Sequence, residues 1–292
     1  MTTECLELPD GDFVDLAWRD AGNGPLVIVL HGLEGSVESP YARRIMAAIS
    51  AHGWGACLLH FRGCSGRANR LPRSYHSGDT GDLSFLVNTL RDRFPTRALV
   101  AIGYSMGGNV LLKWLGEQGA EAPLAAAAAV SVPFDLEAAA RRLEQGFSRL
   151  YQYHLLQSLR GKMSAKLTRF KLPFTAQILT AARTFWHYDE FVTAPLHGFR
   201  NAADYYARSS ARFYLATIRT PTLILHARDD PFLPETAIPR ACPTTVTLEI
   251  HARGGHVGFL TDPAPGWTRP WLESRLVHYL QTTVFRETAG CG

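Results

Sequence analysis

Apolar residues in the first 133 positions gather into short continuous runs, and segments with helical spacing separate these runs. The four runs are Pro25–Gly32, Trp54–Phe61, Ala98–Tyr104 and Leu124–Val132. An uninterrupted apolar run of this length is typical of a strand that is buried on both faces. The segments expected to be helices are Ser39–Gly53, Gly81–Phe94 and Met106–Gly119. Strands that alternate with helices in this way predict an α/β fold, a mostly parallel sheet flanked by helices.

The alternation stops near Phe134 and resumes near Ala216. The sequence between them favours helices without a regular repeat. Two further strands are expected within Thr220–Pro234 and Thr245–Phe259, and a last helix over Trp271–Phe285. The simplest interpretation is one sheet domain, formed by residues 1–133 and 216–292, with a helical cap inserted at 134–215.

The predicted cap differs in composition from the rest of the chain. From Phe134 to Tyr214 there are 12 Arg and Lys against 6 Asp and Glu, a net charge of +6, whereas the whole chain has +4. The same segment holds 15 of the 31 aromatic residues. We expect some of these aromatic side chains to line a pocket for an apolar acyl chain, because apolar clefts bind apolar ligands.

Composition excludes several classes of protein. The 292 residues are 46% hydrophobic and 19% charged, which is ordinary for a globular protein. No apolar window approaches the roughly 18 residues of a membrane helix, and the N-terminus lacks the features of a signal peptide. Five cysteines without a CxxC pair predict neither a disulfide framework nor a zinc site. We therefore expect a cytoplasmic protein without metal, organic cofactor or nucleic-acid partner.

A serine lies between two glycines at the junction of a predicted strand and a predicted helix. Residues Gly103–Gly107 read GYSMG and match the pattern G-x-S-x-G in the setting that a nucleophilic serine requires. So tight a turn needs small residues two positions before and after the serine. It also places the Ser105 hydroxyl at the N-terminus of a helix, whose positive end stabilises an oxyanion. The pattern predicts that Ser105 is a catalytic nucleophile.

A serine nucleophile needs a base, and the base needs a carboxylate that orients it. In folds with this serine turn, the order along the chain is serine, acid, histidine. Asp229 and Asp230 follow a predicted strand, and His256 lies in a glycine-rich loop after the next strand. His256 is therefore the expected base. Successive residues leaving a strand point in opposite directions, so either Asp229 or Asp230, but not both, faces it.

Acyl transfer also needs two backbone N–H groups that bind the oxyanion. Met106, directly after Ser105, is one expected donor. Leu33 is the other, in the loop His31–Ser36 after the first long strand. A His-Gly loop at this place resembles the oxyanion element of lipases and esterases. We expect His31 itself to have a structural role.

Nine stretches of the chain resemble one family closely. They are HGLEGS, FRGCSG, YHSGDTGDL, GYSMGGNVLLKWLGE, VSVPFDL, TAPLHGF, DYYARSS, PTLILHARDDPF and GGHVGFL, and they run from residue 31 to residue 260. The pattern is similar to that of the YheT-like branch of the α/β-hydrolase superfamily, which includes yeast medium-chain ester synthase/esterases and mammalian phospholipase-like proteins. The resemblance implies the α/β-hydrolase fold and a triad of Ser105, Asp230 and His256.

These residues predict a serine hydrolase that cleaves carboxylic esters with short to medium acyl chains. Its substrate would be a small ester, bound through the acyl chain. An acyltransferase would use the same residues but pass the acyl group to an alcohol instead of water. A phospholipase-like enzyme at a membrane surface and a binding module without catalysis are further alternatives. The complete set of Ser105, an acid and His256 disfavours the binding module.

Overall fold

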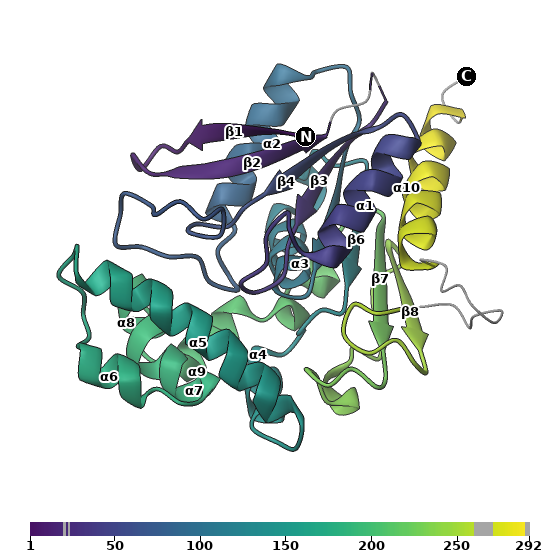
Figure 1. Ribbon diagram of the computed structural model, residues 1–292. Coiled ribbons are helices and arrows are strands. Elements are labelled where there is room, and N and C mark those ends of the chain that lie inside the picture. Colours follow the sequence, from purple (N-terminus) through teal and green to yellow (C-terminus); the bar gives the residue numbers. More distant parts are fainter. Residues whose placement is uncertain (20–21, 23, 260–270, 290–292) are drawn as a thin grey trace, which may run out of the picture.

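The computed structural model of the protein describes residues 1–19, 22, 24–259 and 271–289, with side chains in the last helix described as far as Phe285. Leu260, the end of the matched stretches, lies outside the described residues. A sheet of eight strands crosses the molecule in the order β1-β2-β4-β3-β5-β6-β7-β8 (Figure 1). The strands are β1 (Thr2–Glu7), β2 (Phe13–Arg19), β3 (Leu26–Leu30), β4 (Gly55–Leu59), β5 (Leu99–Tyr104), β6 (Ala126–Val130), β7 (Thr222–Ala227) and β8 (Val246–His251). Strands β3 to β8 pair in parallel, which confirms the predicted fold class.

Strand β6 illustrates why the central strands are continuously apolar. Its alternate residues enter two different cores: Ala127 and Ala129 contribute to one, and Ala126 and Ala128 to the other. Helices α2 (Gly81–Arg93) and α3 (Met106–Gln118) cover the first core, and α1 (Pro40–Ala51) and α10 (Trp271–Ala289) cover the second (Figure 1). Neither face of the strand is exposed to water, so all of its side chains are apolar.

The N-terminal hairpin is not predicted by the apolar runs. Strands β1 and β2 pair antiparallel, and β2 pairs antiparallel with β4, so the sheet is mixed at this edge. Strand β1 is mostly exposed, and its alternating sequence lacks a continuous apolar run. The available signal is the turn Pro9-Asp10-Gly11, in which Gly11 has φ 82° and its N–H donates to the carbonyl of Leu8 at 3.0 Å.

The chain between β6 and β7 forms helical elements joined by loops, and they lie beside the sheet domain (Figure 1). These elements are α4 (Leu136–Leu143), α5 (Ser148–Leu167), α6 (Ala176–Ala181), α7 (Phe185–Tyr188), the π-helical turn η2 (Asp189–Thr193), α8 (Ala194–His197), α9 (Ala202–Ser209), η3 (Ala211–Phe213) and η4 (Leu215–Thr217). Elements α4 to α9 share a hydrophobic cluster of their own, whereas Ala211 of η3 and Leu215 of η4 belong to the first core of the sheet domain. We call this insertion the cap; its exact boundaries as a domain remain a prediction. Among the described residues, no helix is both long and apolar enough to cross a membrane.

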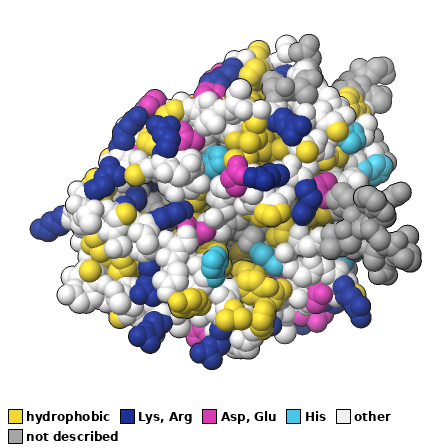
Figure 2. All heavy atoms as spheres, in the orientation of Figure 1, with side chains coloured by type: hydrophobic (Ala, Val, Ile, Leu, Met, Phe, Trp, Pro, Cys, Tyr) yellow, Lys and Arg dark blue, Asp and Glu magenta, His cyan; other side chains and the backbone are white. Residues whose placement is uncertain are grey.

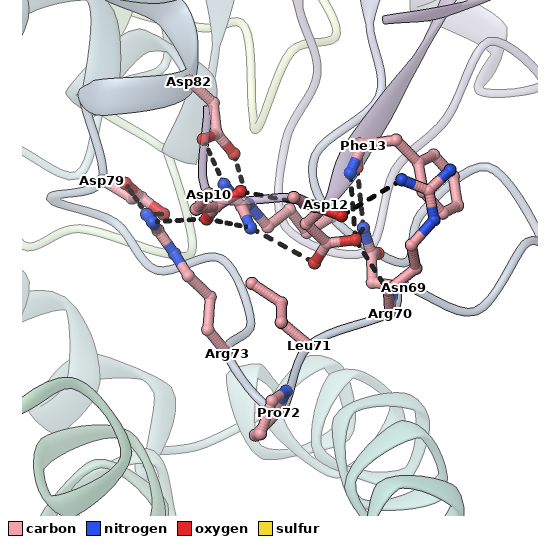
Figure 3. A network of polar contacts seen from close by, with 12 residues as sticks. Asp10, Asp12, Phe13, Asn69, Arg70, Leu71, Pro72, Arg73, Asp79 and Asp82 are labelled. Atoms are coloured by element: carbon pink, nitrogen blue, oxygen red, sulfur yellow. Dashed lines mark hydrogen bonds and ion pairs between the residues drawn. The ribbon is translucent and has the colours of Figure 1, made fainter. Parts of the chain in front are cut away.

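A buried ion-pair network ties the loop after β4 to the N-terminal hairpin (Figure 3). Arg62 donates two hydrogen bonds of 2.7 Å to Asp82 at the start of α2, and its third nitrogen lies 2.8 Å from Asp10 and 3.2 Å from Asp12. The Asn69 side chain donates to Asp12 at 2.9 Å. Buried charges need such partners. The network fixes the long loop that leads to the pocket described below.

Candidate active site

Ser105 occupies a strained turn between β5 and α3. Its backbone has φ 51° and ψ −120°, outside the regions that non-glycine residues favour. A Cβ on Gly103 would lie 2.5 Å from the Gly107 carbonyl oxygen, and one on Gly107 would lie 2.5 Å from that of His31. Real Cβ atoms do not approach so closely, so both positions require glycine. The sequence pattern around Ser105 is therefore a consequence of packing at this turn.

A continuous chain of hydrogen bonds joins Ser105, His256 and Asp230. The Ser105 hydroxyl lies 2.9 Å from His256 Nε2, and His256 Nδ1 lies 2.9 Å and 3.1 Å from the two carboxylate oxygens of Asp230. The three side chains come from the ends of β5 and β7 and from the loop after β8. An imidazole between a hydroxyl and a carboxylate can take the hydroxyl proton while the carboxylate stabilises its charge.

Packing around Phe232 holds the histidine ring in place. The Phe232 ring stacks on His256 with centroids 3.9 Å apart and planes 16° from parallel. Its backbone N–H donates to Asp230 at 2.8 Å, and Asp230 is only 4% exposed. The buried carboxylate therefore has donors on both oxygens and a fixed orientation.

The adjacent carboxylate, Asp229, makes different contacts. One of its oxygens accepts the backbone N–H groups of Gly254 and Gly255, at 2.9 Å and 2.8 Å. These residues immediately precede His256. Asp230 thus contacts the imidazole ring, whereas Asp229 shapes the loop that presents it.

The predicted oxyanion donors lie on either side of Ser105. Leu33 and Met106 line the same pocket as the serine. Among the described residues, neither backbone N–H has a hydrogen-bond acceptor. Gly32 brings the loop so close that a Cβ there would lie 3.2 Å from Ser105 Cβ. Their role as oxyanion donors remains a prediction, and the free N–H groups support it.

His31 has partners that account for it without catalysis. It is completely buried, its Nε2 accepts the N–H of Phe61 at 3.1 Å, and its Nδ1 lies 2.7 Å from the carbonyl of Gly32. Nδ1 must therefore carry the proton. Burial lowers the pKa of His31 to about 3, so the ring is neutral and joins β3 to the loop after β4.

The cap helix α5 contacts the loop that carries Leu33. Glu34, the next residue, accepts hydrogen bonds from Tyr75 at 2.6 Å and from Lys162 of α5 at 2.9 Å, and Ser158 of α5 donates to its other oxygen. One turn further along α5, Lys166 donates to the carbonyls of Leu71, Pro72 and Arg73. These contacts could not be predicted from the sequence, because they join segments that are far apart along the chain.

A pocket opens at Ser105 between the sheet domain and the cap. Its empty volume, with the mouth included, is about 940 Å³. Apolar cap side chains form most of its wall, including Leu136, Leu143, Leu159, Met163, Phe185 and Val192. In Figure 2, further hydrophobic side chains gather on the surface in the lower part of the view. No group of three or more His, Cys, Asp or Glu suited to a metal ion occurs among the described residues.

This arrangement of fold and site matches known proteins. A sequence model of the alpha/beta hydrolase fold matches residues 25–263, which is most of the chain. The chain belongs to the α/β-hydrolase family. Within this family it is 43% identical to the "Putative esterase YheT" of Escherichia coli. The alignment is 298 residues long and covers 98% of this chain and 86% of that protein. The resemblance to the YheT-like branch is thereby confirmed.

Two more distant proteins extend the comparison. The monoacylglycerol lipase of Saccharomyces cerevisiae is 34% identical over 88% of this chain, which spans only 59% of the yeast protein. The solved structure of the Pyrococcus furiosus esterase Pf2001 superposes with a TM-score of 0.64 over 96% of this chain and 90% of that one, at 19% identity. The structural likeness supports the fold alone.

One ionisable residue of the pocket is absent from the predicted site. Asp189, in the π-helical turn η2, lines the pocket and accepts hydrogen bonds from Thr193 at 2.6 Å and from Tyr206 at 2.8 Å. Burial raises its pKa from 3.8 to about 6. A raised folded-state pKa means that the unfolded chain releases this proton at lower pH. The Asp189 carboxyl therefore destabilises the fold increasingly as the pH rises from about 4 to 6.

Replacing Asp189 with Asn is expected to stabilise the protein at neutral pH. The amide has the same shape but no charge to bury, so the free energy of unfolding should rise by about 3 kcal/mol at pH 7.5. The gain should shrink towards zero as the pH falls to 4. Urea unfolding of both proteins at pH 4.5 and 7.5 measures it, and an equal gain at both values would contradict the expected titration.

Proposed function

We propose that this α/β-hydrolase cleaves carboxylic esters of short- to medium-chain acids through an acyl-enzyme on Ser105. The observation that carries the proposal is the hydrogen-bond chain from Ser105 through His256 to Asp230 at the wall of an apolar pocket. The names of the relatives in Escherichia coli and yeast, a putative esterase and a monoacylglycerol lipase, also support ester hydrolysis.

In this mechanism, His256 removes the proton of Ser105 as the oxygen attacks the ester carbonyl. Asp230 keeps the proton-bearing Nδ1 facing it and stabilises the imidazolium. The backbone N–H groups of Leu33 and Met106 bind the oxyanion of the tetrahedral intermediate. His256 then gives its proton to the leaving alcohol. Water, activated by the same histidine, attacks the acyl-enzyme and releases the acid.

The pocket supports an acyl chain as the bound part of the substrate. The wall that the cap contributes is mainly aliphatic, as suits an apolar ligand. Each buried methylene contributes roughly 0.8 kcal/mol, so a medium chain gains affinity until it fills the space.

Two neighbouring aromatic residues of the cap should differ in their effect on chain-length preference. Phe185 lines the pocket, whereas Trp186 does not and packs instead on Tyr206 and Arg141. Phe185→Ala should shift the preferred acyl length, with kcat/KM ratios changing about fourfold per methylene. Trp186→Ala, the matched control, should change kcat/KM equally for acetyl to decanoyl esters. Equal profiles for the two variants would contradict this assignment of the pocket wall.

A panel of p-nitrophenyl esters from acetate to dodecanoate tests the proposed function directly. Hydrolysis by the purified protein should be fastest for an intermediate chain. Added ethanol then measures how much of the acyl-enzyme is captured by an alcohol instead of water. The proposal fails if no ester is hydrolysed faster than by a Ser105→Ala variant prepared in the same way.

A further inference from the structure

Several ionisable side chains occur together in one part of the mainly apolar pocket. His76, His197, Tyr205 and Asp189 all line it. The rings of His76 and His197 are 4.6 Å apart at their centroids, and that of Tyr205 is 5.6 Å from His76. Tyr205 also packs on Tyr206, the hydrogen-bond donor to Asp189, with ring centroids 5.3 Å apart. We call these four residues the polar subsite. The mechanism above uses none of them.

Hydrogen bonding fixes two donors of the polar subsite. His76 Nδ1 accepts the N–H of Gly78 at 3.2 Å, so a neutral His76 carries its proton on Nε2. The Tyr205 oxygen accepts the N–H of Ser77 at 2.9 Å, and its own hydrogen remains to be donated. Within the described part of the chain, no side chain or carbonyl accepts the His76 hydrogen, and the Tyr205 hydroxyl has the side chain of Ser77 as a further hydrogen-bonding neighbour.

The remaining members add acceptors. His197 makes only ring contacts among the described residues, so one of its nitrogens can donate and the other can accept. Asp189 receives one hydrogen bond on each carboxylate oxygen, from Thr193 and Tyr206. Each oxygen has a second lone pair. His76 and His197 are partly exposed to the pocket, so a ligand or water can use this spare hydrogen-bonding capacity.

The chemistry of the set selects among ligands. Burial lowers the pKa of both His76 and His197 to about 3, so neither ring offers a positive charge to an anion, and Asp189 would repel one. A cation would find Asp189 but would face the N–H and O–H donors of His76 and Tyr205. A hydroxyl group satisfies both kinds of partner, because it donates one hydrogen bond and accepts others.

We infer that the polar subsite binds a hydroxyl group of the substrate, remote from the ester bond, and that this enzyme prefers hydroxylated esters. The ligand hydroxyl would donate to Asp189 and accept from His76 or Tyr205. This inference rests on the proposed ester hydrolysis at Ser105. It names the class of ester that the pocket is built to select.

Two series of esters distinguish where the hydroxyl lies in the substrate. In the acyl series, butyl esters of hexanoic, octanoic and decanoic acid are compared with their ω-hydroxy counterparts. In the alcohol series, butyrate esters of hexanol, octanol and decanol are compared with the matching ω-diol monoesters. In at least one series, a hydroxylated ester should exceed its parent in kcat/KM by roughly tenfold or more, as expected for a hydrogen bond to a charged group.

Variants connect that preference to the polar subsite. Asp189→Asn removes the charged acceptor, and His76→Phe keeps an aromatic ring while removing the donor. Both should reduce the ratio of hydroxylated to parent kcat/KM towards one, with the parent ester affected much less. Val192→Ala, an apolar position of the same pocket, is the control and should leave the ratio unchanged. A purely structural role would lower both rates in proportion and would overturn the inference.

Failure of this inference can be separated from failure of the proposed function. Hydrolysis of the parent esters without any hydroxyl preference rejects the polar subsite and leaves ester hydrolysis standing. If no ester is cleaved, calorimetric titration with 8-hydroxyoctanoic acid and with octanoic acid tests the polar subsite by itself. Tighter binding of the hydroxy acid, lost in Asp189→Asn, supports the polar subsite, and equal binding overturns it.

Discussion

Replacing Ser105 with alanine should abolish both ester hydrolysis and covalent labelling by a fluorophosphonate. The variant keeps His256 and Asp230 but has no oxygen to form the acyl-enzyme. Because triad residues act as a unit, kcat should fall by roughly 10⁴ to 10⁶. Alanine at the strained position, φ 51°, removes no hydrogen bond of the backbone, so the fold should persist.

Mass spectrometry of the labelled protein checks this expectation residue by residue. The probe should modify Ser105 alone in the unaltered protein and nothing in the variant. Circular dichroism and a thermal melt provide the control for folding. Labelling that survives in a folded Ser105→Ala protein would show that another residue is the nucleophile.

Replacing Asp230 with asparagine should lower kcat by roughly 10⁴ while leaving the protein folded. The carboxylate faces His256 Nδ1 at 2.9 Å, and the amide would stabilise the wrong imidazole tautomer, with the proton on the nitrogen that faces Ser105. The amide oxygen can still accept the N–H of Phe232. The loss should therefore appear in kcat and much less in the free energy of unfolding.

Asp229 provides the matched control for Asp230, one residue away. Asp229→Asn retains an oxygen for the N–H groups of Gly254 and Gly255, so kcat should change little. Asp229→Ala removes both hydrogen bonds and should cost about 1–2 kcal/mol of stability. If Asp229→Asn lost more kcat than Asp230→Asn, with both variants folded, Asp229 would be the acid.

The central strands and helices could be predicted because each is determined by its own sequence. A strand such as β3, buried on both faces, can only be apolar, and the turn at Ser105 can only have glycine at positions 103 and 107. The edge strand β1 could not be found in this way, since its half-exposed residues depend on pairing with β2.

The wall of the pocket could not be predicted because it is assembled from distant segments. His76 comes from the loop before α2, while His197 and Tyr205 come from the cap. Their stretches belong to the family resemblance, which implies no catalytic role for them. The choice between Asp229 and Asp230 likewise needed either that resemblance or the geometry, since strand alternation alone leaves it open.

The contacts of α5 with Glu34 couple the position of the cap to the conformation of the loop that carries Leu33. A cap that swings away would take Lys162 and Ser158 from Glu34 and leave the loop of Leu33 less restrained. Such coupling is reciprocal. If Leu33 and Met106 bind the oxyanion as proposed, an acylating inhibitor that places its oxygen against them should also favour the cap position seen here, and a cap held away should lower the rate of the first chemical step.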